Sequence, residues 1–215
     1  MRPRASGGTV PVMSEQTNTD TQRRIFLAGA SGVIGIRLLP LLVQDGHTVA
    51  GMTRSASKLA ELEALGAQAV VCDVYDLEAL TAAVTRFAPD AVMHQLTDLP
   101  DDAAQIPELS SRNDRMRTEG TRNLLAAAKA AGAARFYAQS IAWELPGERG
   151  VATHAFERTV LDGGGVVIRY GQLYGPGTYY ETTIPDPPRI QIDEAARRTV
   201  PLLDAPSGIV ELVEY

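Results

Sequence analysis

The segment 25–35, IFLAGASGVIG, constrains the fold of this chain more than any other. A short apolar run ends at Gly29, two more glycines follow at three-residue intervals, and an apolar helical pattern continues to about Asp45. This order predicts a strand, a tight turn and a helix. Gly29 permits the turn, Gly32 leaves room for a diphosphate, and Gly35 lets helix and strand pack closely. The segment therefore predicts a dinucleotide-binding unit; the alternative is a glycine-rich turn in a generic α/β protein.

The start of that helix is the expected phosphate site. Unpaired N–H groups there carry a partial positive charge that suits a diphosphate. The residues expected to contact the coenzyme at this turn are Gly29, Ser31, Gly32, Val33, Ile34 and Gly35.

Length, charge and cysteine content exclude several classes of protein. The 215 residues suffice for one domain with a full core. The net charge of −6 argues against a nucleic-acid-binding surface, and no apolar run reaches the roughly 18 residues needed to cross a bilayer. The single cysteine, Cys72, excludes an internal disulfide and argues against a cysteine-based metal cluster. We expect a cytoplasmic protein with a small-molecule substrate and no bound metal.

Apolar runs alternate with helical patterns along most of the chain. Residues 1–22 are polar and predict a disordered tail, in which Met13 is an alternative start. Residues 23–215 predict a single α/β domain built on a Rossmann-type, doubly wound parallel sheet. Further strands are expected at 47–54, 67–72, 91–94, 134–138 and 166–170, and further helices at 56–65, 76–87 and about 113–131.

The C-terminal part has a different pattern. Residues 174–188 are rich in proline and tyrosine and predict a loop, residues 190–203 predict a short strand and a helix, and residues 208–214 predict a last strand. This segment is too short for a second domain. From about residue 174 we therefore expect a small, truncated cap over one edge of the sheet.

The end of the second predicted strand indicates which coenzyme is preferred. An acidic residue there binds the ribose 2′-hydroxyl of NAD. This chain has Arg54 at that position, with Lys58 close behind it and no acid. A guanidinium pairs with a 2′-phosphate, whereas a carboxylate repels it. The position favours NADP(H) over NAD(H); the alternative is that Arg54 is a solvated charge after a strand.

Two other strand ends supply candidate coenzyme contacts. Asp73 follows the third strand and is placed to accept a hydrogen bond from an adenine amino group, with the Val74 N–H as donor; capping of the next helix is the alternative. Gln95 and Leu96 end the fourth strand and should lie along the ribose and phosphates. His94 is either a catalytic residue or a core histidine.

Several segments together resemble the extended and atypical short-chain dehydrogenases/reductases, a group that includes nucleotide-sugar epimerases and NmrA-like proteins. These segments are GASGVIG, TRSASK, CDVYD, EGTRNLLAAAKAAGAARFYAQS and VVIRYGQLYGPGT, and the resemblance covers about residues 24–178. It implies a catalytic Ser or Thr after the fifth strand, matched by Ser140. It also implies a Tyr and a Lys four residues apart on the next helix. This chain lacks that pair, since Arg149 and Thr153 fall near those two positions.

Without the Tyr–Lys pair, either another group donates the proton or the substrate is already activated, as a quinone or a flavin is. The candidate catalytic residues are Ser140, His154 and Tyr174, and Glu157, Tyr170, Tyr179 and Tyr180 are further polar groups near the expected site. His154 and Glu157 lie three residues apart on one helix face. Each has a structural alternative: a helix N-cap for Ser140, and packing roles for the others.

The loop Gly175-Pro176-Gly177 resembles the family loop that shapes the nicotinamide pocket, so Pro176 is a candidate coenzyme contact. A short cap favours an open pocket, or one completed by a second subunit, and aromatic substrates rather than sugar nucleotides. The first hypothesis is an NADPH-dependent reductase of a small carbonyl or quinone-like metabolite. The alternatives are a nonredox isomerase, cyclase or dehydratase, and an NmrA-like NADP-sensing protein. The helices of the family's two-fold interface predict a homodimer.

Overall fold

The computed structural model describes residues 22–215, so the predicted tail lies outside the described residues except for Gln22. The main strands are β1 Arg24–Ala28, β2 Thr48–Thr53, β3 Gln68–Val71, β4 Ala91–His94, β5 Arg135–Ile141, β6 Val166–Tyr170 and β9 Gly208–Leu212, and a small sheet contains β7 Gln172–Tyr174 and β8 Arg189–Gln191. The helices are α1 Gly35–Gln44, α2 Leu59–Ala64, α3 Leu77–Phe87, α4 Ile106–Arg115, α5 Thr121–Ala130, α6 Gly147–Asp162 and α7 Ile192–Thr199.

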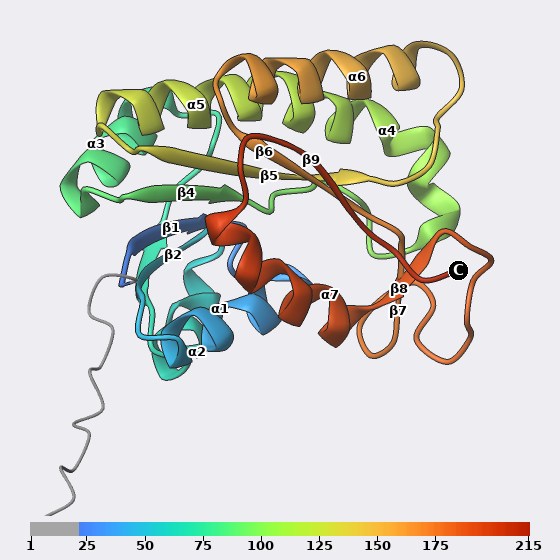
Figure 1. The fold of residues 1–215 in the computed structure, drawn as a ribbon, viewed down its shortest axis with the longest axis horizontal. Coiled ribbons are helices and arrows are strands. Elements are labelled where there is room, and N and C mark those ends of the chain that lie inside the picture. Colours follow the sequence, from blue (N-terminus) through green and yellow to red (C-terminus); the bar gives the residue numbers. More distant parts are fainter. Residues whose placement is uncertain (1–21) are drawn as a thin grey trace, which may run out of the picture.

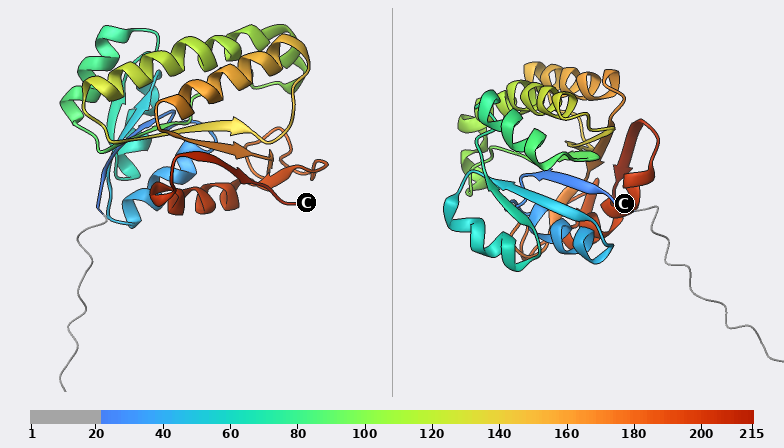
Figure 2. Two further views of the ribbon diagram at one scale, coloured as in Figure 1. Left: turned by 45° about the horizontal axis from the view of Figure 1, so that its top comes forward. Right: turned by 90° about the vertical axis from the view of Figure 1, so that its left-hand side faces the viewer.

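The main sheet has the order β3-β2-β1-β4-β5-β6-β9, and every neighbouring pair is parallel (Figure 1). Helices cover both of its faces, with α1, α2 and α7 on one side and α3, α4, α5 and α6 on the other (Figure 2). The predicted Rossmann-type, doubly wound sheet is therefore confirmed. Among residues 22–215, no helix combines the length and the apolar character that crossing a membrane requires.

Strand β1 shows why the sheet needs two helical layers. Successive side chains of a strand point to opposite faces. Ile25 and Leu27 join the core beneath α1, whereas Phe26 and Ala28 join the core beneath α3 and α5, and all four are completely buried. A strand that is apolar on both faces is stable only between two layers.

The chain reverses its winding direction beside β1. From β1 it moves outward to β2 and β3, then returns to form β4 on the other side of β1. The ends of β1 and β4 are held together by the Gln95 N–H, which donates to the Ala28 carbonyl at 2.8 Å. In open α/β sheets, ligands bind at the carboxyl ends of the strands at such a reversal. This position receives both the glycine turn and the residues that follow β4.

Most predicted elements are confirmed, with two corrections. The long helix starts at Ile106, not at about residue 113, because Pro107 lies in its first turn, where a missing N–H costs no hydrogen bond. It continues through a π-helical turn, Met116–Gly120, into α5. Strand β5 extends to Ile141, so Ser140 lies within the strand and not after it. The alternative of a helix N-cap for Ser140 is therefore wrong.

The C-terminal cap is smaller than predicted. Strand β9 pairs with β6 as the last strand of the main sheet, and α7 packs beside α1. Within residues 172–215, the β7–β8 pair and the loop 175–188 lie outside the main layers (Figure 1). Assigning every residue from about 174 to a cap is therefore wrong for α7 and β9, because Leu212 and Ile192 are buried in the domain core.

Candidate coenzyme site

The glycine turn has the conformation that its sequence predicts. Gly29 has φ +90°, and a Cβ atom there would lie 2.7 Å from the Gln95 carbonyl oxygen. A Cβ on Gly35 would lie 2.1 Å from the Gly29 carbonyl oxygen. Neither glycine can accept a side chain without movement of the backbone. The turn and the first residue of α1 are thus packed directly against each other and against the end of β4.

The same turn offers unpaired donors where a diphosphate would bind. Among the described residues, no acceptor is bonded to the backbone N–H groups of Ser31, Val33 and Ile34. Gly32 is exposed, and a Cβ there would approach only the Gly29 carbonyl oxygen, at 3.3 Å. Free amides, an open glycine and a helix N-terminus fit a diphosphate group. The turn residues therefore suit the coenzyme, and their individual contacts remain a prediction.

Arg54 lies after β2, where the adenosine ribose is expected, but its guanidinium has a protein partner. Its Nη2 atom is 3.4 Å from the carboxylate of Asp98, which also binds Arg112 at 2.8 Å. Lys58 lies farther along and pairs with Glu61 at 2.8 Å on the exposed surface. The structure thus brings two arginines to one buried carboxylate. Asp98 and Arg112 were not among the predicted site residues, although the position of Asp98 just after β4 was a usable signal.

Asp73 lies just after β3, at the end of the strand where the adenine is expected. Asp73 is exposed, and its Oδ1 accepts from the Tyr75 N–H at 2.9 Å. The helix cap is a different residue, Asp76, whose Oδ1 accepts from the Ala79 N–H at 3.0 Å. Val74 is buried, and its carbonyl oxygen accepts from the side chain of Asn123. Because Asp76 supplies the helix cap, Asp73 does not cap α3, and its contact with adenine remains a prediction.

Strand β4 ends at a core histidine, His94, which is followed by the buried Gln95 and by Leu96. His94 is 2% exposed, its Nδ1 accepts from the Leu96 N–H at 3.2 Å, and its Nε2 therefore carries the hydrogen that faces Thr121, at 2.9 Å. Burial lowers the pKa of His94 to about 4. His94 is thus the core histidine of the two alternatives. The side-chain oxygen of Gln95 is buried and has no hydrogen-bond partner among the described residues.

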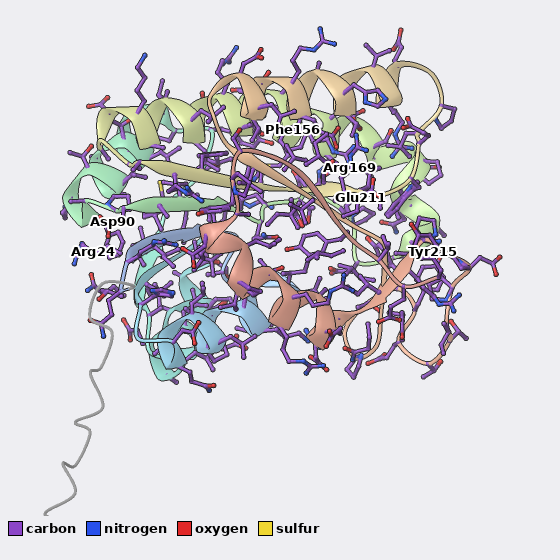
Figure 3. All side chains as sticks on the ribbon, in the orientation of Figure 1. Arg24, Asp90, Phe156, Arg169, Glu211 and Tyr215 are labelled. Carbon is purple, nitrogen blue, oxygen red and sulfur yellow. The ribbon has the colours of Figure 1, made fainter. Side chains whose placement is uncertain are left out.

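Ser140 is fixed by a buried charged network. Its hydroxyl donates to Glu157 Oε1 at 2.6 Å, and Arg169 Nη2 binds the other Glu157 oxygen at 2.6 Å. Burial raises the pKa of Glu157, but hydrogen bonds from Arg169 and Ser140 outweigh it, so the net pKa lies below the ordinary value. Figure 3 shows Arg169 beside Glu211 of β9, which it contacts at 3.4 Å. A charge inside the apolar run 166–170 was the sequence signal for this network.

The other two candidate catalytic residues also face carboxylates. His154 Nε2 lies 3.1 Å from Glu144, and His154 lines a cavity of about 120 Å³ with Trp143, Arg169 and Glu211. None of the predicted coenzyme residues lines this cavity. The Tyr174 hydroxyl donates to Glu214 at 2.8 Å, which raises the pKa of Tyr174. The structure therefore does not gather Ser140, His154 and Tyr174 around one reacting atom.

The remaining tyrosines also have packing or loop partners. Tyr170 is buried, and its hydroxyl lies 2.6 Å from that of Thr199; burial raises its pKa to about 12. The Tyr179 hydroxyl donates to the Pro100 carbonyl. In the same loop, the Pro176 carbonyl accepts from Arg37 of α1. Loop 175–180 is thereby tied on one side to α1 and on the other to the segment after β4.

Comparison with known proteins agrees with this site. A family model described as NAD(P)H-binding matches residues 29–161. A Streptomyces sp. protein named 3-diazoavenalumate denitrifying reductase is 40% identical over 181 residues, which are 73% of this chain and 58% of that protein. A 3-beta-hydroxysteroid dehydrogenase of Mycolicibacterium neoaurum is 31% identical over 126 residues, 58% of this chain and 33% of that enzyme. The chain therefore spans 58% or less of the length of these relatives.

Solved structures share the fold. The UDP-glucose 4-epimerase of Thermus thermophilus in complex with NAD has a TM-score of 0.73 and 19% identity over 88% of this chain and 77% of that chain. The Bordetella bronchiseptica enzyme WbmH in complex with NAD⁺ has a TM-score of 0.71 and 18% identity over 90% of this chain and 76% of that chain.

The fold and the glycine turn together define an α/β protein of the dinucleotide-binding class. The chain belongs to the NAD(P)H-binding family, whose model covers more than half of it. Its resemblance to the extended and atypical short-chain dehydrogenases/reductases is confirmed.

Proposed function

We propose that this protein is an NADPH-dependent reductase that transfers hydride to a small aromatic metabolite already activated toward hydride, a quinone-like carbonyl or a diazo compound. The relative named as a reductase of a diazo compound supports the redox class and this kind of substrate. Arg54 supports NADPH over NADH, since its guanidinium suits a 2′-phosphate. The loop 175–180 carries Tyr179 and Tyr180, and the Tyr179 hydroxyl donates to the Pro100 carbonyl in the segment after β4, so aromatic groups lie beside that segment.

The observation that carries the proposal is that each candidate proton donor faces a carboxylate. Ser140 donates to Glu157, Tyr174 donates to Glu214, and the His154 nitrogen near Glu144 must carry the hydrogen because a carboxylate only accepts. A substrate that needed a proton in the same step as the hydride would lack a free donor. A quinone or a diazo group accepts the hydride electron pair into its own π system, and water can protonate the product afterwards.

The roles of the chain's residues follow from their positions. When bound, NADPH supplies the hydride from its nicotinamide. The amides of Ser31, Val33 and Ile34 bind the diphosphate, and Arg54 binds the 2′-phosphate. Loop 175–180 excludes water from the nicotinamide end of the crevice. The backbone next to Gln95 holds the coenzyme ribose against the sheet edge.

The test follows the loss of NADPH absorbance with a panel of acceptors. Menadione and a benzenediazonium salt are the activated acceptors, and cyclohexanone and acetophenone are the unactivated ones; each is corrected for its reaction without protein. We expect turnover of activated acceptors only, and the Ser140→Ala variant should retain most of the rate. NADPH binding by calorimetry without oxidation by any acceptor would instead support the NADP-sensing alternative. Rapid turnover of the simple ketones would contradict the proposal.

A further inference from the structure

Two arginines lie at the place where the family's Tyr–Lys pair would be. Arg149 is in the first turn of α6, and Thr153 follows one turn later on the same helix face. Arg117, from the π-helical turn between α4 and α5, donates from Nη1 to Thr153 Oγ1 at 3.1 Å. Helix α6 lies beside the continuous helical segment formed by α4, the π-helical turn and α5, on one face of the sheet (Figures 1 and 2). The Thr153 hydroxyl in turn donates to the Arg149 carbonyl at 2.9 Å. Arg117, Arg149 and Thr153 therefore form one cluster.

The cluster has more positive charge than its carboxylates neutralise. The side chain of Arg117 is only 13% exposed, and its nearest carboxylate, Asp114, is 4.0 Å away, too far for a hydrogen bond. Burial lowers the pKa of Arg117, and the neighbouring Arg149 adds to this effect. Glu157 is also near but is already bound by Arg169 and Ser140. Within residues 22–215, Arg117 thus has no hydrogen-bonded carboxylate, and a second guanidinium, that of Arg149, lies close enough to lower its pKa.

One hydrogen-bond donor of the cluster and one acceptor beside it also have no partner in the part of the chain that the structure describes. Among the described residues, Arg149 Nε is buried and has no acceptor, and Asp114 Oδ1 is buried and has no donor. Buried polar groups of this kind usually have a partner, which is a water molecule or a ligand where the protein supplies none. Arg115, two residues before Arg117, does not join the cluster, since its guanidinium lies over the Tyr75 ring at 3.9 Å.

The geometry points to a substrate-anchoring site in which Arg117 and Arg149 bind a carboxylate of the aromatic substrate. A planar guanidinium matches a carboxylate with two parallel hydrogen bonds, which a single hydroxyl or carbonyl cannot reproduce. This inference rests on the proposed function and narrows its substrate class to aromatic carboxylates. Arg149, which lies near the position of the proton-transferring tyrosine in the family, then binds and orients an anion.

A binding experiment without turnover tests this site. The probe is cinnamate, its neutral control is cinnamamide, and binding to the protein with NADP⁺ is followed by fluorescence of the single tryptophan, Trp143, with calorimetry as a second method. We expect cinnamate to bind at least about tenfold more tightly than cinnamamide. Arg149→Gln and Arg117→Gln should each abolish that preference. Arg158→Gln, an exposed arginine on the same helix, should retain it.

A further variant keeps the test informative if Arg117→Gln unfolds. Asp114→Asn removes the opposing carboxylate and should tighten cinnamate binding severalfold without changing cinnamamide binding. Equal binding of both probes to the unaltered protein, or a preference that survives Arg149→Gln, would overturn the anchoring site. The proposed reductase is judged separately: oxidation of NADPH by menadione with no cinnamate preference refutes only the anchor, and a cinnamate preference without NADPH oxidation refutes only the reductase.

Discussion

At the scale of single residues, Gly32 and Gly35 differ in the space that a side chain would have. An added Cβ on Gly35 would lie 2.1 Å from a backbone oxygen, whereas on Gly32 it would meet only one atom at 3.3 Å. We expect Gly35→Ala to lower the free energy of unfolding by about 3 kcal/mol or more, and Gly32→Ala by under about 1 kcal/mol. Gly32→Ala should instead weaken NADPH binding at least about tenfold, because its methyl occupies the diphosphate position. Urea denaturation measures the stability of each variant, and calorimetry measures its affinity for NADPH. A large stability loss in Gly32→Ala with unchanged NADPH affinity would contradict a diphosphate site at this turn.

Arg54 tests the coenzyme preference. Arg54→Ala should weaken NADPH binding by about tenfold to a hundredfold, roughly 1.4 kcal/mol per tenfold, and NADH binding very little. Lys129→Ala is the control, since Lys129 is exposed in the last turn of α5, before the start of β5, and should affect neither coenzyme. Dissociation constants for both coenzymes are measured at low and at moderate salt, because screening should reduce the preference. Equal losses for the two coenzymes would remove the NADPH assignment.

His94 predicts a pH dependence of stability. In the unfolded chain it binds a proton near pH 6.5, but burial lowers its native pKa to about 4. Falling pH therefore favours the unfolded state through the window from 6.5 to 4, by up to about 3 kcal/mol in total, and His94 has no effect above that window. His94→Gln should reduce the slope of the unfolding free energy against pH within the window only. Urea denaturation of both proteins across the window measures this slope, and identical slopes would contradict the prediction.

At the scale of elements, Glu157 joins β5, α6 and β6 through Ser140 and Arg169. It is 3% exposed, so removing its charge leaves Arg169 without its main partner. We expect Glu157→Gln and Arg169→Met each to destabilise by about 3 kcal/mol. The double variant should lose less than the sum of the two, with a coupling energy of about 1–3 kcal/mol. A double-mutant cycle by urea denaturation measures it, and additive losses would show that the ion pair contributes nothing.

Elements were predictable where local chemistry alone decides them. The glycine turn, the cap at Asp76 and the apolar runs at 91–94 and 166–170 each contain their own signal. The start of α4 was not predictable from Pro107 alone, since the same residue both interrupts a helix and opens one. For β5, the run 135–141 continues past its apolar part because Ser140 finds a buried acceptor on α6. That contact depends on tertiary packing.

At the scale of the whole molecule, some parts of the candidate site were predictable from local sequence, whereas others depend on tertiary packing. The glycine turn was predictable because one continuous segment, 25–35, builds it. The contacts of the candidate catalytic and substrate-binding residues were not predictable, because they join residues far apart in the chain, such as Tyr174 with Glu214 and Arg117 with Thr153. Side-chain types gave candidates, but only packing shows that Ser140 and Tyr174 are bonded to carboxylates.

Strand β9 gives the last prediction, which concerns the integrity of the whole domain. Since it pairs with β6 along five residues and Leu212 is 3% exposed, the C-terminal segment completes the sheet. Deleting residues 206–215 would expose the edge of β6, whose Val167 and Ile168 are completely buried. We expect a loss of more than about 3 kcal/mol and aggregation through the exposed edge. Deleting only Tyr215, which is 87% exposed, should leave thermal unfolding unchanged. If both deletions had equal melting temperatures and no light scattering, the C-terminal segment would be a dispensable cap.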